Sequence, residues 1–377
     1  MAAEVDVVVV GAGLMGAAAA WSAARRGLSV QVLEQFAAGH RNGSSHGSAR
    51  IVRRAYGDGL YVRLTGRAFE LWRELERDAG TPLLRTLGGL DFGPRRDVAR
   101  MARLLTEAAV EHEVLTASAA EQRWLGMRFD GPVLFHPQAA TVDSAAAVTA
   151  MLDVARRLGA QVRFAAPVTA VQHVGDRVRL SCADGTSLHA RRAIVAAGAW
   201  LGPLLGGGFG LPALRVTQQQ LFHFPRLDAA VPPWPSVIHE DVRGIYHLAG
   251  GRDGGPGDAR KIGEHDTGHA TTAATRDDVV DPQSRARVIE YVQRWLPGLD
   301  PVPQGEATCL YTSTPSEDLL LDRVGPIVVC SACSGHGAKF APLIGELAVG
   351  LATGDGEVPE RFRLAAHACA PPGAVSL

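Results

Sequence analysis

Three glycines near the start of the chain have the spacing of a phosphate-binding turn. Gly11, Gly13 and Gly16 form a G-x-G-x-x-G pattern. Glycine there permits a tight turn, a close approach of the backbone to a pyrophosphate and close helix–strand packing. Glu34 ends the next apolar run, where a carboxylate can accept hydrogen bonds from ribose hydroxyls. The pattern predicts a dinucleotide site, and the alternative is a purely structural glycine turn.

Cysteine is the second residue type that could do chemistry, because a thiolate is both a nucleophile and a metal ligand. Cys309 lies in Ala-Thr-Cys-Leu-Tyr-Thr-Ser-Thr, and Cys330 and Cys333 form a C-x-x-C pair with His336 beyond them. A structural zinc site needs four ligands, and no second pair has suitable spacing, so no metal is predicted. On pattern alone, Cys309 is a small buried residue and Cys330 a structural one.

Basic residues recur in three further segments. Arg50, Arg53 and Arg54 follow a polar Asn-Gly-Ser-Ser-His-Gly stretch, Lys261 precedes Ile-Gly-Glu-His, and Lys339 follows Ser-Gly-His-Gly-Ala. A guanidinium can bind a carboxylate through its planar fork of donors. The pattern alone also fits a solvated basic loop, a surface lysine on a strand and a surface lysine at a helix cap.

Apolar periodicity predicts the elements that would position these residues. Residues 5–10 form a continuous apolar run typical of a parallel strand buried on both faces. With a helix at 12–26 and a strand at 29–34 they make a βαβ unit. Further helices are expected at 61–79, 97–111, 144–158, 283–296 and 341–352, and strands within 88–94, 161–197, 214–250, 306–312 and 326–331. A flexible turn or loop is expected at 251–258 and a frayed tail from 364.

The composition excludes several classes of protein. The 377 residues carry 38 Lys and Arg against 39 Asp and Glu, whereas nucleic-acid binders usually have a strong basic excess. No apolar run approaches the about 20 residues of a membrane span, and the N-terminus lacks the basic region of a signal peptide. Because the chain has only five cysteines, we expect a reducing, cytoplasmic environment rather than a disulfide scaffold.

The glycine motif does not by itself distinguish FAD from NAD, but three features favour FAD. The βαβ unit is N-terminal, and residues 192–200 form an apolar strand that ends in a small-residue turn at Gly198. Residues 335–345 again place Gly-rich backbone at a helix start. Such a helix N-terminus can stabilise negative charge on a reduced flavin.

Taken in order, the segments resemble the monomeric sarcosine oxidase family, which includes N-methyltryptophan oxidase and lies within the D-amino-acid-oxidase-like flavoproteins. The resemblance runs nearly end to end and rests on VDVVVVGAGLMG, NGSSHGSARIVRRAYGDG, GGLDFGP, VAAGAW, GIYH, KIGEH, TCLYTST and SGHGAKF. It implies an α/β fold and a monomer. The expected FAD-binding Rossmann-like domain (1–86, 143–217 and 314–377) is interleaved with a β-sheet-rich substrate domain (87–142 and 218–313).

The resemblance also implies roles at the site. It implies a covalent bond from Cys309 to FAD, Arg50 near the flavin, and a substrate carboxylate between Arg53 and Lys339. Lys261 would lie beside the flavin and activate oxygen. Cavity residues are expected at His265 and Tyr311, a flavin-facing histidine at His46, and further cofactor contacts at Gly11, Gly13, Met15, Gly16, Glu34, Ser44, Arg50, Gly198, Gly335, His336, Gly337 and Lys339.

Two positions depart from the sarcosine-specific pattern. His247 stands where a second tyrosine follows Gly-Ile-Tyr, and Cys333 stands where an aromatic residue precedes Ser-Gly-His-Gly. His247 is therefore expected near the substrate, and the identity of the amine stays open.

The sequence thus predicts an oxidase of a secondary, N-methyl amino acid that uses O2 and releases H2O2. The imine product would hydrolyse to formaldehyde and a primary amine. One alternative is oxidation of a cyclic or primary amino acid or of a biosynthetic intermediate. Two others are an NAD-dependent dehydrogenase built on the same βαβ unit and a nucleotide-binding protein without catalysis.

Overall fold

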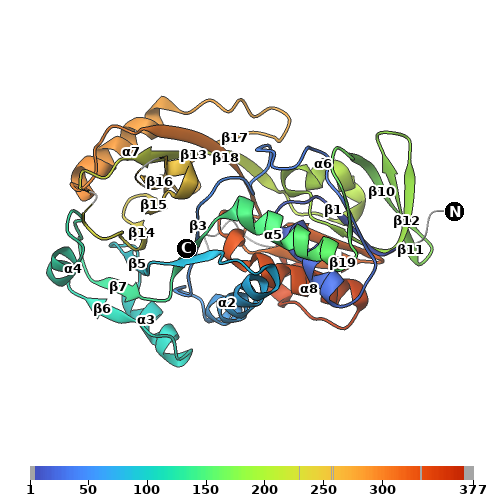
Figure 1. Cartoon of the computed structure of the whole chain (residues 1–377), viewed down its shortest axis with the longest axis horizontal. Coiled ribbons are helices and arrows are strands. Elements are labelled where there is room, and N and C mark those ends of the chain that lie inside the picture. Colours follow the sequence, from blue (N-terminus) through green and yellow to red (C-terminus); the bar gives the residue numbers. More distant parts are fainter. Residues whose placement is uncertain (1–4, 229, 256, 258, 332, 369–377) are drawn as a thin grey trace.

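The computed structural model describes residues 5–228, 230–255, 257, 259–331 and 333–368. Two large sheets lie toward opposite ends of the molecule, with helices packed between and around them (Figure 1). No helix in these described ranges is long and apolar enough to cross a membrane.

The first sheet has eight strands and carries the glycine turn. Its central strand, β1 (Val5–Val10), is flanked in parallel by β2 (Val30–Leu33) and β12 (Ser187–Val195), and its valines are buried. The outer strands are β9 (Gln161–Arg163), β10 (Val168–Val174), β11 (Arg177–Cys182), β19 (Leu320–Val324) and β20 (Ile327–Ser331).

Four helices pack on one another beside this sheet: α1 (Leu14–Arg25), α2 (Gly59–Ala79), α5 (Ser144–Arg157) and α8 (Ala341–Thr353). The alanines of α1 let α8 approach closely. A Cβ atom on Gly345 of α8 would lie only 2.4 Å from the carbonyl carbon of Ala18. The two helix backbones therefore touch where they cross.

The second sheet has nine strands: β5 (Gly89–Phe92), β6 (Glu113–Leu115), β7 (Val133–His136), β13 (Arg215–Phe224), β14 (Ser236–Glu240), β15 (Gly244–Ala249), β16 (Arg260–Glu264), β17 (His269–Ala270) and β18 (Gly305–Ser313). Its inner strand β16 pairs antiparallel with both β13 and β15, and α7 (Pro282–Trp295) packs on β13 and β16. A small sheet of β3 (Arg50–Val52), β4 (Leu84–Thr86) and β8 (Ala140–Val142) completes the fold with α3 (Val98–Glu107), α4 (Ala117–Arg123), α6 (Leu201–Leu205) and α9 (Leu364–Ala368).

The predicted α/β class is confirmed, as are the initial βαβ unit and the five longer helices. In the predicted turn or loop at 251–258, Gly251–Gly254 form a 3-10 turn, and residues 256 and 258 lie outside the described residues. The frayed tail is wrong for Leu364–Ala368, which are helical; the rest of the tail lies outside the described residues. Strands β3, β4 and β8 were not predicted, because three residues are too few to show a period of two.

Candidate active site

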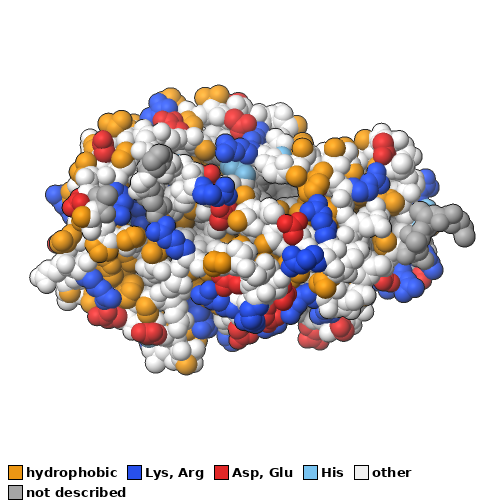
Figure 2. Space-filling view, viewed as in Figure 1, with side chains coloured by type: hydrophobic (Ala, Val, Ile, Leu, Met, Phe, Trp, Pro, Cys, Tyr) orange, Lys and Arg blue, Asp and Glu red, His pale blue; other side chains and the backbone are white. Residues whose placement is uncertain are grey.

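A cavity of about 800 Å³ runs from the glycine turn to β18. The predicted residues on its wall are Gly11, Gly13, Met15, Glu34, Ser44, His46, Arg50, Gly198, Cys309, Tyr311, Gly335 and Gly337. These come from segments far apart in the sequence. Figure 2 shows the molecular surface hollowed near its centre, where a histidine side chain is visible.

The glycine turn has the form of a backbone cradle at the start of α1. A Cβ on Gly11, whose φ is +95°, would lie 2.5 Å from the carbonyl oxygen of Ala196. A Cβ on Gly16 would lie 1.8 Å from the carbonyl oxygen of Gly11, so Gly16 supports the turn from behind. The first turn of α1 carries no acidic residue, and its N-terminus favours an anion. The cradle fits the pyrophosphate of FAD.

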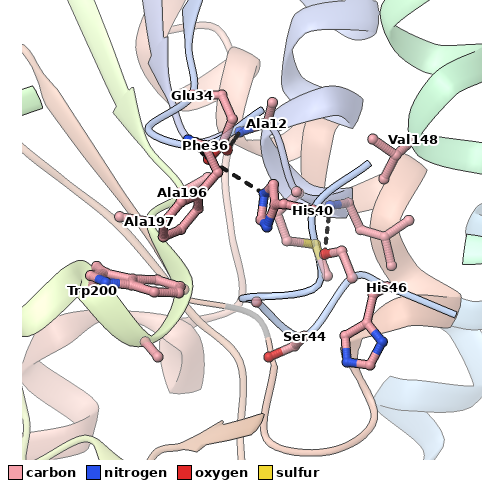
Figure 3. A pocket seen from close by; sticks show the side chains of 18 of the residues that line it. Ala12, Glu34, Phe36, His40, Ser44, His46, Val148, Ala196, Ala197 and Trp200 are labelled. Atoms are coloured by element: carbon pink, nitrogen blue, oxygen red, sulfur yellow. Dashed lines mark hydrogen bonds and ion pairs between the residues drawn. The ribbon is translucent and has the colours of Figure 1, made fainter. Parts of the chain in front are cut away.

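Glu34 is fixed beside this cradle (Figure 3). Its Oε2 accepts a hydrogen bond from the backbone N–H of Ala12 at 2.8 Å, and its Oε1 accepts one from that of Phe36 at 3.0 Å. Phe36 meets Trp200 edge-on with ring centroids 5.4 Å apart. A fixed carboxylate next to aromatic rings suits the ribose and adenine of a dinucleotide.

Cys309, Arg50 and His46 lie at the other end of the cavity. The Cys309 thiol is free and lies 3.9 Å from the carbonyl oxygen of Ser44. The Arg50 guanidinium donates to the carbonyls of His46 (2.6 Å) and Ser44 (3.1 Å), which fixes it to the cavity loop. Burial, reinforced by the charge of Arg50, lowers the pKa of His46 to about 4. His46 is therefore neutral at physiological pH.

Lys261 lies on β16 with only 4% of its surface exposed, so the alternative of a surface lysine is wrong. Its Nζ donates to the carbonyl of Ala49 at 3.1 Å. Burial first, and then the positive charge of Arg50, lower the pKa of Lys261 to about 7. The amine is thus held at the edge of the cavity loop with its charge sensitive to pH near neutrality.

Arg53 and Lys339 lie together beneath the loop, and both are nearly fully buried. The Arg53 guanidinium carbon lies 4.6 Å and the Lys339 Nζ lies 5.5 Å from the centroid of the same Tyr56 ring. His265 contacts Tyr311, with ring centroids 5.7 Å apart. Burial first, and then the charges of Lys339 and Arg53, lower the pKa of His265 to about 3. The alternatives of a solvated basic loop and a surface helix cap are therefore wrong for Arg53 and Lys339.

The lining of the cavity does not include every predicted residue. Those that lie off its wall are Gly16, Arg53, His247, Lys261, His265, His336 and Lys339. His336 hydrogen-bonds with Tyr56 through Nδ1 at 3.1 Å and with the carbonyl of Glu317 through Nε2 at 3.1 Å, so both ring nitrogens have protein partners. The contact of His336 with the cofactor stays a prediction.

His247 faces away from the predicted substrate residues. Its Nδ1 accepts a hydrogen bond from Arg260 at 2.8 Å. Successive side chains of a strand point to opposite faces. The neighbouring Tyr246 lies on the face toward Tyr311 and Arg50: it hydrogen-bonds with Tyr311, and the charge of Arg50 acts on its pKa. Of these two neighbours, Tyr246 and not His247 lies beside the predicted site residues Tyr311 and Arg50. The alternation of side chains along Gly-Ile-Tyr-His would identify Tyr246 only if the face of the strand toward the cavity were known.

The described residues contain no group of three or more His, Cys, Asp or Glu side chains that could hold a metal ion. The described site combines a backbone cradle for a dinucleotide, a thiol and buried cations.

Comparisons with known proteins agree with this reading. The family model DAO, described as FAD dependent oxidoreductase, matches residues 6–351. The chain is 31% identical over 368 residues to monomeric sarcosine oxidase of Bacillus sp. (strain NS-129), which covers 94% of each chain. It is 32% identical over 363 residues to N-methyl-L-tryptophan oxidase of Escherichia coli O127:H6, covering 92% of this chain and 94% of the other.

Among solved structures, the chain is similar to NikD, an unusual amino acid oxidase essential for nikkomycin biosynthesis. The TM-score is 0.83 at 25% identity, covering 99% of this chain and 98% of NikD. The predicted resemblance and the choice of FAD are confirmed, and the NAD-dependent dehydrogenase is excluded by the family match. The chain belongs to the DAO family of FAD-dependent oxidoreductases.

Proposed function

We propose that the protein oxidises a secondary, N-methyl amino acid with O2, releasing H2O2 and an imine. One observation carries this proposal: two buried cations, Arg53 and Lys339, share the ring of Tyr56 beside the cavity that also holds Cys309. Nη1 of Arg53 is buried and makes no hydrogen bond among the described residues, and its ion pair with Oδ1 of Asp91 is long, at 3.6 Å. A buried donor of this kind calls for an anion, and the carboxylate of an amino acid fits.

The cofactor-holding residues belong to the same proposal. The cradle at Gly11, Gly13 and Gly16 would hold the pyrophosphate, Glu34 the ribose, and Cys309 would bind the flavin covalently. Residues 1–86, 143–217 and 314–377 would form the FAD-binding domain, with 87–142 and 218–313 forming the substrate domain. The protein would act as a monomer in the cytoplasm, and the four described cysteines are free, as a reducing compartment requires.

When bound, FAD supplies the two-electron redox chemistry. Arg53 and Lys339 bind the substrate carboxylate and hold the amino acid against the cavity wall. Their positive charges disfavour an ammonium group nearby, and oxidation needs the neutral amine. Lys261 stabilises the negative charge that develops on dioxygen, an effect that is strongest where water is scarce. The released imine hydrolyses in water.

A peroxide-release screen over N-methyl, cyclic and primary amino acids tests the proposed substrate class. We expect the largest turnover with an N-methyl amino acid, accompanied by formaldehyde in equal amount. Peroxide from cyclic or primary amino acids without formaldehyde would instead favour the alternative class. No peroxide from any of these acids would remove the oxidase assignment.

Replacing Arg53 with Met should weaken the binding of a carboxylate inhibitor such as acetate by about tenfold to over a hundredfold. A charge-assisted hydrogen bond contributes about 1.5–3 kcal/mol, and each 1.4 kcal/mol corresponds to about tenfold. The dissociation constant can be read from the change in flavin absorbance on titration. Arg54→Met is the matched control, because Arg54 donates to the carbonyl of Val62 on α2. Unchanged acetate binding in Arg53→Met would remove Arg53 from this role.

A further inference from the structure

Lys339 is a buried amine that has no ion-pair partner in the part of the chain that the structure describes. It is 6% exposed, and its Nζ makes one hydrogen bond within the described residues, to the carbonyl of His336 at 2.7 Å. A buried ammonium group is costly unless an anion lies beside it. The site therefore favours the uncharged amine until an anion arrives.

Asp91, the carboxylate whose charge acts on Lys339, is already paired with other cations. Asp91 accepts hydrogen bonds on Oδ1 from Nε and Nη2 of Arg96, at 3.1 and 2.5 Å. The same oxygen lies 3.6 Å from Nη1 of Arg53. Arg53 and Lys339 both contact the Tyr56 ring, and burial together with the positive charge of Arg53 holds the pKa of Lys339 well below its usual range. The negative charge of Asp91 raises the pKa of Lys339, but by less than burial and Arg53 lower it.

We propose that Lys339 accepts the ammonium proton of the amino-acid substrate as the substrate carboxylate binds. The N–H bond of the substrate breaks, its electron pair stays on the substrate nitrogen, and a new N–H bond forms on Nζ. The substrate is left with the neutral nitrogen that oxidation needs, and Lys339 becomes the counter-ion of the carboxylate. This inference rests on the proposed function, in which Lys339 binds that carboxylate.

The other groups that face Lys339 keep one protonation state between about pH 6 and pH 9. Arg53 stays charged because an arginine does not deprotonate in proteins. The cations beside Asp91 lower its pKa, burial raises the pKa of Tyr56 and Tyr61, and burial lowers the pKa of His265 to about 3 and that of His336 well below its usual range. Glu317 is the exception, since burial and Asp266 raise its pKa to about 7. Its carbonyl contacts the His336 ring, so Glu317→Gln is a necessary control.

Calorimetry of the FAD-loaded protein with acetate tests the proton transfer, because acetate carries no ammonium proton. The binding enthalpies measured at about pH 8 in phosphate and in Tris differ in proportion to the number of protons exchanged with the buffer, because the two buffers have different enthalpies of ionisation. We expect uptake of close to one proton per acetate in the wild type and in Glu317→Gln. Lys339→Arg should bind acetate with no uptake, because a guanidinium is already protonated. The dissociation constant of the wild type should rise about tenfold per pH unit, since binding the anion requires a proton.

The amino acid that gives most peroxide in the screen supplies the second measurement. Its apparent dissociation constant, taken from anaerobic flavin reduction, should stay flat over this pH range in the wild type. In Lys339→Arg it should fall with rising pH, because the substrate must then lose its proton to solvent.

The outcomes separate this inference from the proposed function. If Lys339→Met, with its FAD retained, binds acetate as tightly as the wild type, the carboxylate role of Lys339 fails. If Lys339→Met binds acetate at least tenfold more weakly but the wild type takes up no proton, the carboxylate role stands and the proton transfer is overturned.

Discussion

Replacing Lys261 with Met should slow the reoxidation of the reduced protein by oxygen about a thousandfold. The substitution removes a buried charge that is fixed to the carbonyl of Ala49 and keeps most of the side-chain volume. A loss of about 4 kcal/mol from the transition state corresponds to this factor, and electrostatic stabilisation of this size is typical of preorganised sites. Stopped-flow absorbance measures reoxidation and anaerobic reduction separately, and reduction by substrate should change far less.

The pH dependence of the reoxidation rate provides a second test of Lys261. The protonated lysine is the active form, so wild-type reoxidation should be fastest below the Lys261 pKa of about 7 and fall as the pH rises through it. His46 and His223, which also face this amine, have their pKa values lowered to about 4 by burial, and neither titrates in this range. Lys261→Met should show no such fall, and Lys261→Arg should keep much of the rate. If Lys261→Met reoxidises at wild-type speed, the activating charge belongs to another cation, with Arg50 the first to examine.

Replacing Cys309 with Ala should abolish covalent attachment of the flavin. The thiol lies on β18 at the wall of the cavity, where it can reach a cofactor held by the glycine cradle. Acid precipitation of the wild type should give a yellow pellet, whereas the variant should release its FAD into the supernatant.

Cys330→Ala is the matched control for this experiment. Cys330 also borders the cavity but belongs to β20, and burial raises the pKa of its thiol to about 12, so it should stay unreactive. A colourless wild-type pellet with free FAD would contradict the covalent bond, and a colourless pellet from Cys330→Ala alone would transfer the attachment to that residue.

The parts of the site that the sequence predicts best are those made by neighbouring residues. The cradle and Glu34 belong to one βαβ unit, so their geometry follows from local spacing alone. The burial of Lys261 and Lys339 depends on contacts with distant segments such as Ala49 and Tyr56. Each of these lysines taken alone is compatible with a surface position, and only the resemblance to a family brought them into one site.

His247 shows a different limit. Its segment was identified correctly, but the side of the sheet that faces the cavity depends on how β15 pairs with β14 and β16. A shift of one residue exchanges the two faces of a strand, and local sequence does not fix that choice. The sequence did not identify Asp91 for a related reason, because its ion pair with Arg53 joins two segments that are separate along the chain.

The contact between α1 and α8 constrains how this scaffold can diversify. Gly345 and Ala18 bring the two backbones together. Helix α1 begins at the glycine cradle, and α8 begins two residues after Lys339. Because close-packed backbones do not deform gradually, we expect the spacing between the cradle and Lys339 to be inherited as a unit. Evolution toward a new amine would then proceed by exchanging side chains such as Cys333 or Tyr246, while the distance between the glycine cradle and Lys339 stays the same.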